Sequence, residues 1–213
     1  PSRMRIDREK LIQILKIGLP AGVQGILFSL SIVVIPSSIN SFGAVVMAGN
    51  SAAANIELFV YFAMNAFYQA IISFTSQNFG AGRIKRLYEV LLRGQLCIVV
   101  TGGLLGALVV IFGRTLLGVY SSSDAVISAG MRRLWILCST YALCGMMDGM
   151  VGTLRGIGYS VLPTVVTLLG ACGLRLVWIA TLFQAEAFHT VTTVYLSYPV
   201  SWAVTFGVHV LCF

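Results

Sequence analysis

Residues 44–79 read AVVMAGNSAAANIELFVYFAMNAFYQAIISFTSQNF and carry one charged side chain, Glu57. This stretch is longer than the roughly 20 apolar residues that cross the hydrocarbon core of a bilayer as a helix. Charge is also scarce around it, because Glu57 is the only charged residue between Lys16 and Arg83. Residues 187–213 have no charged residue at all. Several such runs in one chain predict a polytopic membrane protein.

The composition supports an all-α membrane fold. Hydrophobic residues make up 58% of the chain and charged residues 10%, with a mean hydropathy of +0.92. Soluble domains carry about 25% charged residues. A membrane β-barrel would show short segments of about 10 residues with alternating hydrophobicity. The apolar runs here are continuous, so helices are expected.

Motifs that would indicate an enzyme or a bound cofactor are missing from the sequence. The five cysteines are scattered and form no Cys-x-x-Cys pair, which argues against a metal site or a disulfide framework. His-Glu-x-x-His and Gly-x-Ser-x-Gly are also absent. We therefore expect no enzymatic activity, no metal and no cofactor.

The hydropathy pattern predicts six membrane spans after a basic lead-in at residues 1–16. A glycine-rich turn closes the second span, and the fourth span could start as early as Ala125. The expected spans cover residues 17–39, 44–79, 94–113, 134–154, 161–183 and 190–213, so residues 17–213 form the transmembrane unit.

Lysine and arginine predict the orientation of these spans, because they are enriched on the cytoplasmic side. With a cytoplasmic N-terminus, ten basic residues fall on that side and three on the other. The net charge of +7 is therefore interpreted as a topology signal and not as a nucleic-acid surface. The cytoplasmic group is Arg3, Arg5, Arg8, Lys10, Lys16, Arg83, Lys85, Arg86, Arg93 and Arg155; the outer group is Arg114, Arg132 and Arg133.

A polar stripe runs along the second span. Its members fall within an arc of about 80° at the 100° per residue of an α-helix. Phe59, Ala63 and Ala70 lie on the opposite side. Lipid cannot satisfy polar groups, so the stripe should face a water-filled cavity or make hydrogen bonds between helices. The stripe consists of Asn50, Glu57, Tyr61, Asn65 and Tyr68.

Three ionisable residues are expected inside the spans: Glu57, Asp148 and Arg175. Each costs at least about 2.5–3.5 kcal/mol at the bilayer centre, which indicates a functional use or mutual pairing. Counting residues from the cytoplasmic ends matches Glu57 to Arg175 in depth better than it matches Asp148 to Arg175. Either acid could couple transport to protons or cations, or could belong to a structural ion pair.

Three strings at helix junctions resemble one known family. They are GLPAG at residues 18–22, SQNFGAGR at 76–83 and LRGIGYS at 154–160, followed by Pro163. Their order and spacing are similar to the C-terminal six-helix lobe of the multidrug and toxic compound extrusion (MATE) family, and the resemblance covers essentially the whole chain. It implies one lobe of a twelve-helix, two-lobe transporter, with the N-terminal lobe absent from this chain.

The resemblance also implies a function. Members of the family export organic cations and other drugs across the plasma membrane in exchange for H⁺ or Na⁺. The expected partners are the lipid bilayer, small and mostly cationic organic substrates, and the N-terminal lobe, with no nucleic acid. Two alternatives stay open: a flippase for lipid-linked saccharides from the same superfamily, and a membrane enzyme or scaffold without transport.

The sequence departs from the family at one coupling position. Some members carry a glutamate in the first helix of this lobe, where residues 27–30 here read LFSL. Some members use an aspartate in the fourth helix, and Asp148 is the candidate there, about one turn nearer the LRG string. The resemblance thus leaves coupling to Asp148 or to the other lobe.

Overall fold

The computed structural model describes residues 8–213, and within residues 17–32 the backbone but not every side chain. Arg3 and Arg5 of the basic lead-in lie outside the described residues. The described chain is almost entirely helical. Its elements are α1 (Arg8–Asn40), α2 (Ala44–Gly80), α3 (Ile84–Gly118), α4 (Asp124–Gly156), α5 (Val161–Thr167), a π-helical segment (Leu168–Gly173), α6 (Leu174–Ala180), two short 3₁₀ turns (Leu182–Gln184 and Glu186–Phe188) and α7 (Val191–Cys212).

Most helices extend beyond the spans expected from hydropathy. The apolar pattern marks only the part of a helix that crosses hydrocarbon, whereas the helix itself continues into the polar interface. Thus α3 begins at Ile84 and α4 at Asp124, directly after the serine run. The assignment of Arg114, Arg132 and Arg133 to outer loops was wrong, because Arg114 lies inside α3 and the other two residues lie inside α4.

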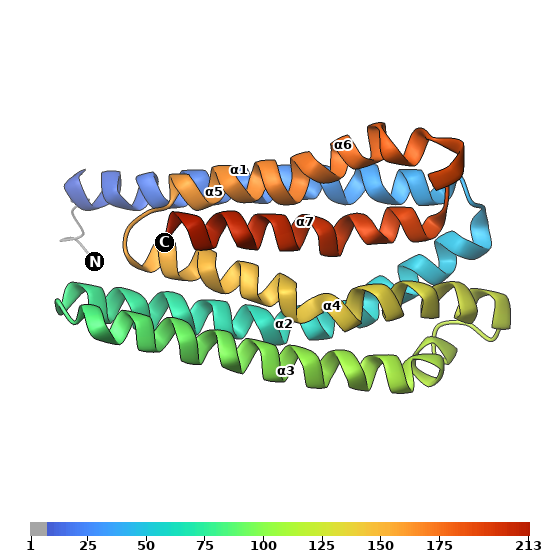
Figure 1. The fold of residues 1–213 in the computed structure, drawn as a ribbon, viewed down its shortest axis with the longest axis horizontal. Helices are drawn as coiled ribbons and strands as arrows, with labels where there is room; N and C mark the ends of the chain where they lie inside the picture. Colours follow the sequence, from blue (N-terminus) through green and yellow to red (C-terminus); the bar gives the residue numbers. More distant parts are fainter. Residues whose placement is uncertain (1–7) are drawn as a thin grey trace, which may run out of the picture.

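Five stretches in the described chain are long and apolar enough to cross a membrane: α2, α3, α4, residues Val161–Gln184, and α7. Together with α1, which has 33 residues, they run alternately up and down the bundle. Figure 1 shows that the start of α1 and the end of α7 lie at the same end of the bundle. An even number of spans produces this arrangement.

The turn between α2 and α3 depends on a glycine. Gly82 has a φ of +68°, a left-handed conformation that a residue without a Cβ adopts without strain. The Arg83 backbone N–H then donates to the carbonyl oxygen of Asn78 at 2.9 Å, and the Gly82 N–H donates to Phe79. These bonds satisfy carbonyls that the end of α2 would otherwise leave free. The sequence SQNFGAGR therefore encodes the end of one helix and the reversal into the next.

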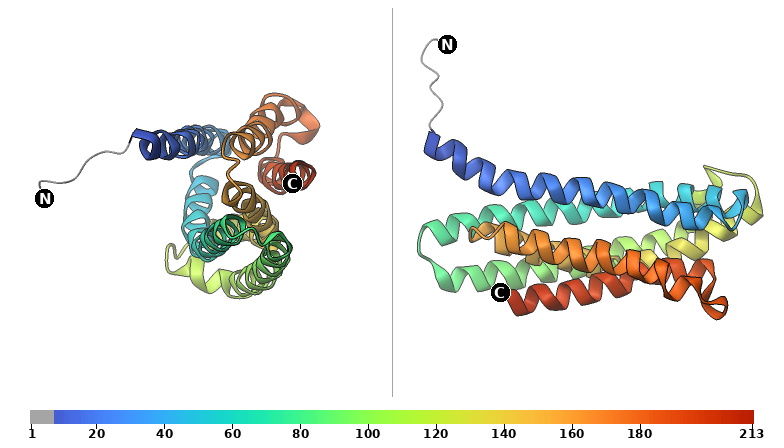
Figure 2. Two further views of the ribbon diagram at one scale, coloured as in Figure 1. Left: turned by 90° about the vertical axis from the view of Figure 1, so that its left-hand side faces the viewer. Right: turned by 90° about the horizontal axis from the view of Figure 1, so that it is seen from above.

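Helix α4 is the centre of the bundle. It has extensive contacts with α2, α3 and α7, whereas α1 contacts its neighbours more sparsely. In the end-on view of Figure 2, α2 and α3 lie on one side of α4, and α1 lies beside α5 on the other side. More than half of the apolar window of α4, 56%, is buried, compared with 22% for α2 and for α3.

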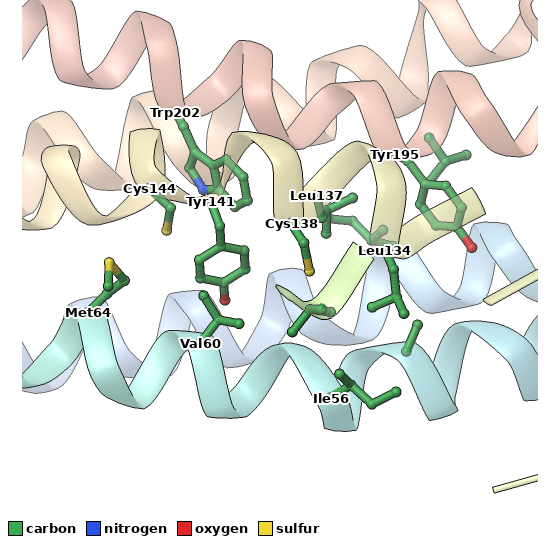
Figure 3. Close-up of a cluster of buried hydrophobic side chains, with 14 of the residues drawn as sticks. Ile56, Val60, Met64, Leu134, Leu137, Cys138, Tyr141, Cys144, Tyr195 and Trp202 are labelled. Atoms are coloured by element: carbon green, nitrogen blue, oxygen red, sulfur yellow. The ribbon is translucent and has the colours of Figure 1, made fainter. Parts of the chain in front are cut away.

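The buried side chains of α4 pack between two neighbouring helices. Figure 3 shows Tyr141 and Cys138 of α4 next to Val60 and Ile56 of α2, with Trp202 of α7 on the other side of α4. The Tyr141 and Trp202 rings meet edge-on with their centroids 5.5 Å apart, a favourable arrangement of aromatic quadrupoles. This packing joins α2, α4 and α7 through one cluster of buried side chains.

Glycines on one face of α3 allow it to approach α4 closely. A Cβ on Gly106 would overlap the carbonyl oxygen of Cys138, and a Cβ on Gly102 would lie 3.0 Å from the Cα of Ala142. A Cβ on Gly103 would meet nothing within 4 Å. The helices therefore pack through a small-xxx-small pattern at positions 102 and 106. The neighbouring Gly103 takes no part in this contact.

This contact yields a paired prediction about stability. Gly106→Ala should destabilise the bundle by about 1–3 kcal/mol, because an added methyl group meets a backbone carbonyl that cannot move aside. Gly103→Ala adds the same methyl group to the same helix in open space and should unfold like the wild-type protein. Thermal unfolding of both variants in detergent is the measurement. Equal melting temperatures for the two variants would contradict the close approach of α3 to α4.

The expected fifth span at residues 161–183 is not a uniform α-helix. Residues 168–173 form a π-helical segment, which adds one residue to a turn and rotates α6 relative to α5. Here α7 approaches closely, because a Cβ on Gly170 would overlap the hydroxyl of Thr205. Arg175 is the second residue of α6, the helix that follows. The π-helical segment therefore determines the direction in which Arg175 points.

Candidate functional site

A cavity of about 630 Å³ lies between α1, α2, α4, α6 and α7. All seven residues selected from the sequence line it: Asn50, Glu57, Tyr61, Asn65, Tyr68, Asp148 and Arg175. Their placement in one cavity is a structural observation, whereas their roles in transport stay predictions.

The polar stripe of α2 faces this cavity. Asn50 and Glu57 are buried, and Tyr61, Asn65 and Tyr68 are half-buried along the cavity wall. The opposite side of the helix faces outward, where Phe59 is 73% exposed. The two interpretations of the stripe therefore coexist: its residues line a cavity, and several of them also form hydrogen bonds to other helices.

Glu57 pairs with Arg133 of α4, not with Arg175 as its depth suggested. The Arg133 guanidinium donates through Nε to Glu57 Oε1 and through Nη2 to Oε2, both at 2.8 Å. Its Nη1 donates to Asn50 Oδ1 at 2.7 Å. This two-point pairing is the strong form of an arginine–carboxylate contact, since it matches the geometry of both groups.

The incorrect partner came from starting the fourth span at residue 134, whereas the earlier start at Ala125, which was also considered, lies next to the observed one. With α4 beginning at Asp124, Arg133 lies inside the bundle and is only 6% exposed. Helices α2 and α4 also share the most extensive contact in the lobe, whereas α2 and α6 have almost none. Arg133 therefore reaches Glu57 directly, and Arg175 does not.

Arg175 is buried among aromatic rings at the other side of the cavity. Its guanidinium carbon lies 4.2 Å from the ring centroid of Tyr198 and 5.6 Å from that of Trp202, within the range of cation–π attraction. Its Nε donates to Ser201 Oγ at 2.7 Å. These contacts come from one face of α7, which carries Tyr198, Ser201 and Trp202. They hold the guanidinium of Arg175 in place.

Asp148 and Arg155 line the opposite end of the cavity, near the loop that joins α4 to α5. Arg155 donates to the Tyr68 hydroxyl at 2.6 Å and to Thr164 Oγ1 at 3.3 Å, so it ties α2 to α5. Asp148 is half-buried and takes part in none of the ion pairs or hydrogen bonds found among residues 8–213. Its carboxylate lines the cavity, where the charge of Arg155 acts on it through space but no described residue donates a hydrogen bond to it.

Sequence reasoning missed several lining residues, namely Arg133, Tyr141, Arg155, Tyr198 and Trp202. The spacing of Tyr198 and Trp202 was a usable signal, because residues four apart lie on the same face of a helix. Arg155 was visible in the LRG string but was counted only as a topology marker. Arg133 could be recognised as a lining residue only once α4 was known to begin at Asp124, because this start places Arg133 inside the bundle.

A comparison with protein-family models gives one match over most of the chain. The family model described as MatE matches residues 20–181. The chain belongs to the MATE family. MATE proteins are transporters and not enzymes, so the family agrees with the expectation that the chain has no enzymatic activity. The resemblance of the three strings at the helix junctions is thereby confirmed.

Individual relatives agree with this assignment. A protein from Bacillus subtilis (strain 168), described as the probable multidrug resistance protein YoeA, is 26% identical over 202 residues, which is 95% of this chain and 43% of the relative. A crystal structure of a MATE protein in complex with MaL6 superposes with a TM-score of 0.88 at 17% identity, covering 98% of this chain and 47% of that one. The MATE transporter ClbM in complex with Rb⁺ superposes with a TM-score of 0.86 at 15% identity, covering 94% of this chain and 46% of that one.

The share of each relative that the chain covers indicates which part of a MATE protein it corresponds to. It spans less than half the length of the relatives that it matches. Its helices superpose on one half of those structures, as expected of one six-helix lobe in a two-lobe MATE fold. The all-α, multi-pass membrane fold predicted from the sequence is confirmed by this match.

Proposed function

We propose that this chain forms one lobe of a secondary active antiporter, which exports organic cations or drugs in exchange for H⁺ or Na⁺. Its partner is a second six-helix lobe, and the two rock against each other to open the cavity to alternate sides of the membrane. The membrane is the plasma membrane, with the N-terminal end of α1 on the cytoplasmic side. The basic residues support this orientation, and moving Arg133 from the outer loop into the bundle increases their asymmetry.

The observation that carries this proposal is the lining of the cavity. It combines the rings of Tyr61, Tyr141 and Trp202 with the carboxylate of Asp148. Aromatic faces attract organic cations, and an acid adds charge complementarity. A carboxylate in the membrane that has no hydrogen bond or ion pair with the described residues is available to a coupling ion or to a cationic substrate. The family relationship to multidrug resistance proteins supports the same substrate class.

The same lining argues against a flippase for lipid-linked saccharides. A pyrophosphate headgroup needs several cationic side chains that are free to bind it. Three arginines line the cavity, but Arg133 is neutralised by Glu57, and Arg155 is bonded to Tyr68 and Thr164. Arg175 remains, and a single guanidinium is a weak site for a pyrophosphate.

Export by cells tests the proposal. The complete transporter that contains this lobe should lower the steady-state accumulation of cationic aromatic dyes when it is expressed in cells that lack their own exporters. Dissipating both the H⁺ and the Na⁺ gradients should restore accumulation to the level of control cells. Unchanged accumulation across a broad panel of dyes, with the transporter present in the membrane, would refute the proposed function.

A further inference from the structure

The guanidinium of Arg175 is available to bind a ligand in the cavity. The residue is only 6% exposed. Because it lines the cavity, its remaining accessible surface forms part of the cavity wall. Its Nε is bonded to Ser201, whereas its two terminal nitrogens have no hydrogen-bond partner among residues 8–213. No carboxylate in the described chain lies within ion-pair distance of it. Arg133 differs, because all three of its nitrogens are bonded.

The surroundings of Arg175 fix its direction. Tyr198 covers one face of the guanidinium at 4.2 Å, and the Ser201 hydroxyl holds its Nε edge. Both partners come from α7, and the π-helical segment before Arg175 orients α6 toward that helix. A guanidinium that is fixed on one face and one edge presents its remaining N–H groups as a planar pair of donors. A carboxylate binds such a pair in a two-point contact.

A second charge, of opposite sign, lies in the same cavity and forms no ion pair with residues 8–213. Asp148 faces the cavity from α4, with Cys144 one helical turn away toward Arg175. Counting residues from the loop between α4 and α5 places Asp148 and Arg175 on the order of 10 Å apart along the helix axes, at 1.5 Å per residue. Aromatic rings of Tyr61, Tyr141 and Trp202 line the same cavity.

Charges in a membrane cavity that have no ion-pair partner are costly, and a ligand that carries both opposite charges would compensate Arg175 and Asp148 together. We propose that Arg175 forms an anion subsite, which binds the carboxylate of an aromatic zwitterionic substrate whose ammonium group lies against Asp148. This inference rests on the proposed function and narrows its substrate class. Arg175 then acts as a specificity residue, because it selects substrates that carry an acid in addition to the cationic group.

A matched pair of ligands isolates the carboxylate. The probes are an aminoxanthene dye with a free benzoic acid and the methyl ester of the same dye, which keeps the cationic ring system and removes the negative charge. Binding of each dye to the purified complete transporter is measured by fluorescence anisotropy. The wild-type protein should bind the acid about tenfold more tightly than the ester, as expected for a charge-assisted contact to arginine. Because this comparison uses the wild-type protein, it does not depend on the folding of any variant.

Variants then assign the preference to Arg175. Arg175→Gln should lower the ratio of acid affinity to ester affinity from about ten to about one. Arg175→Lys, which keeps the charge, should retain part of the preference for the acid. Arg132→Gln is the matched control, because it removes an exposed arginine of α4 and should leave both affinities unchanged. If the wild-type protein binds both dyes with equal affinity, or if Arg175→Gln weakens both dyes equally, the anion subsite is refuted while export of cations stands. If neither dye binds or is exported, the proposed function fails together with the subsite.

Discussion

Replacing Glu57 with glutamine should destabilise the lobe by about 3–5 kcal/mol, because it strands the buried guanidinium of Arg133 without a counter-charge. The two side chains are only 7% and 8% exposed, so water cannot take over the role of the lost carboxylate. Removing both charges should restore most of the stability, since Glu57→Gln/Arg133→Gln leaves neither member of this pair without its counter-charge. The measurement is a double-mutant cycle on thermal unfolding in detergent.

Two controls define the partner of Glu57. Combining Glu57→Gln with Arg175→Gln should give no rescue, because Arg175 makes no contact with Glu57. Glu89→Gln breaks the exposed pair with Arg93, whose side chains are 59% and 82% exposed, and should cost no more than about 0.5 kcal/mol. A rescue by Arg175→Gln that equals the rescue by Arg133→Gln would mean that Glu57 has a different partner in the membrane.

Asp148→Asn should reduce gradient-driven export by at least about tenfold, the equivalent of roughly 1.4 kcal/mol. The carboxylate faces the cavity and is bonded to no other described residue, so its proposed role is to bind the coupling ion and the cationic substrate in turn. Its removal should leave the melting temperature close to that of the wild-type protein, because no ion pair among residues 8–213 is broken. Dye export from proteoliposomes, under an imposed H⁺ gradient or an imposed Na⁺ gradient, measures the effect.

Asp124→Asn is the matched control for the charge. Asp124 starts α4 outside the cavity and pairs with Arg114 at the surface. Its replacement should leave export at the wild-type rate. If Asp148→Asn protein also exports at the wild-type rate, coupling does not depend on Asp148 and belongs to another acid of the complete transporter.

The sequence was sufficient to predict the features that depend on local periodicity. The arc of polar residues on α2 follows from the helical repeat alone, and the structure places all five of them on the cavity wall. The junction string with Gly82 correctly marked the end of a helix, because the left-handed conformation there belongs to glycine.

Features that depend on neighbouring helices were not predictable in the same way. The partner of Glu57 depends on where α4 begins and on which helix packs against α2, and hydropathy reports neither. The orientation of Arg175 depends on one additional residue in a π-helical turn, which no composition signal marks. Gly103 and Gly106 look equivalent in the sequence, yet only Gly106 contacts α4. Each of these features arises from packing between segments that are far apart in the chain.

The location of bound substrate is the most direct test of the claim that the cavity of this lobe receives the transported compound. A cationic aromatic dye with a photoreactive group is irradiated on the purified complete transporter, and labelled peptides are identified by mass spectrometry. We expect labelling on the cavity faces of α2, α4 and α7, at or next to Tyr61, Tyr141 and Trp202, with protection by excess unlabelled dye. Protectable labelling that lies entirely outside these three helices would contradict the claim.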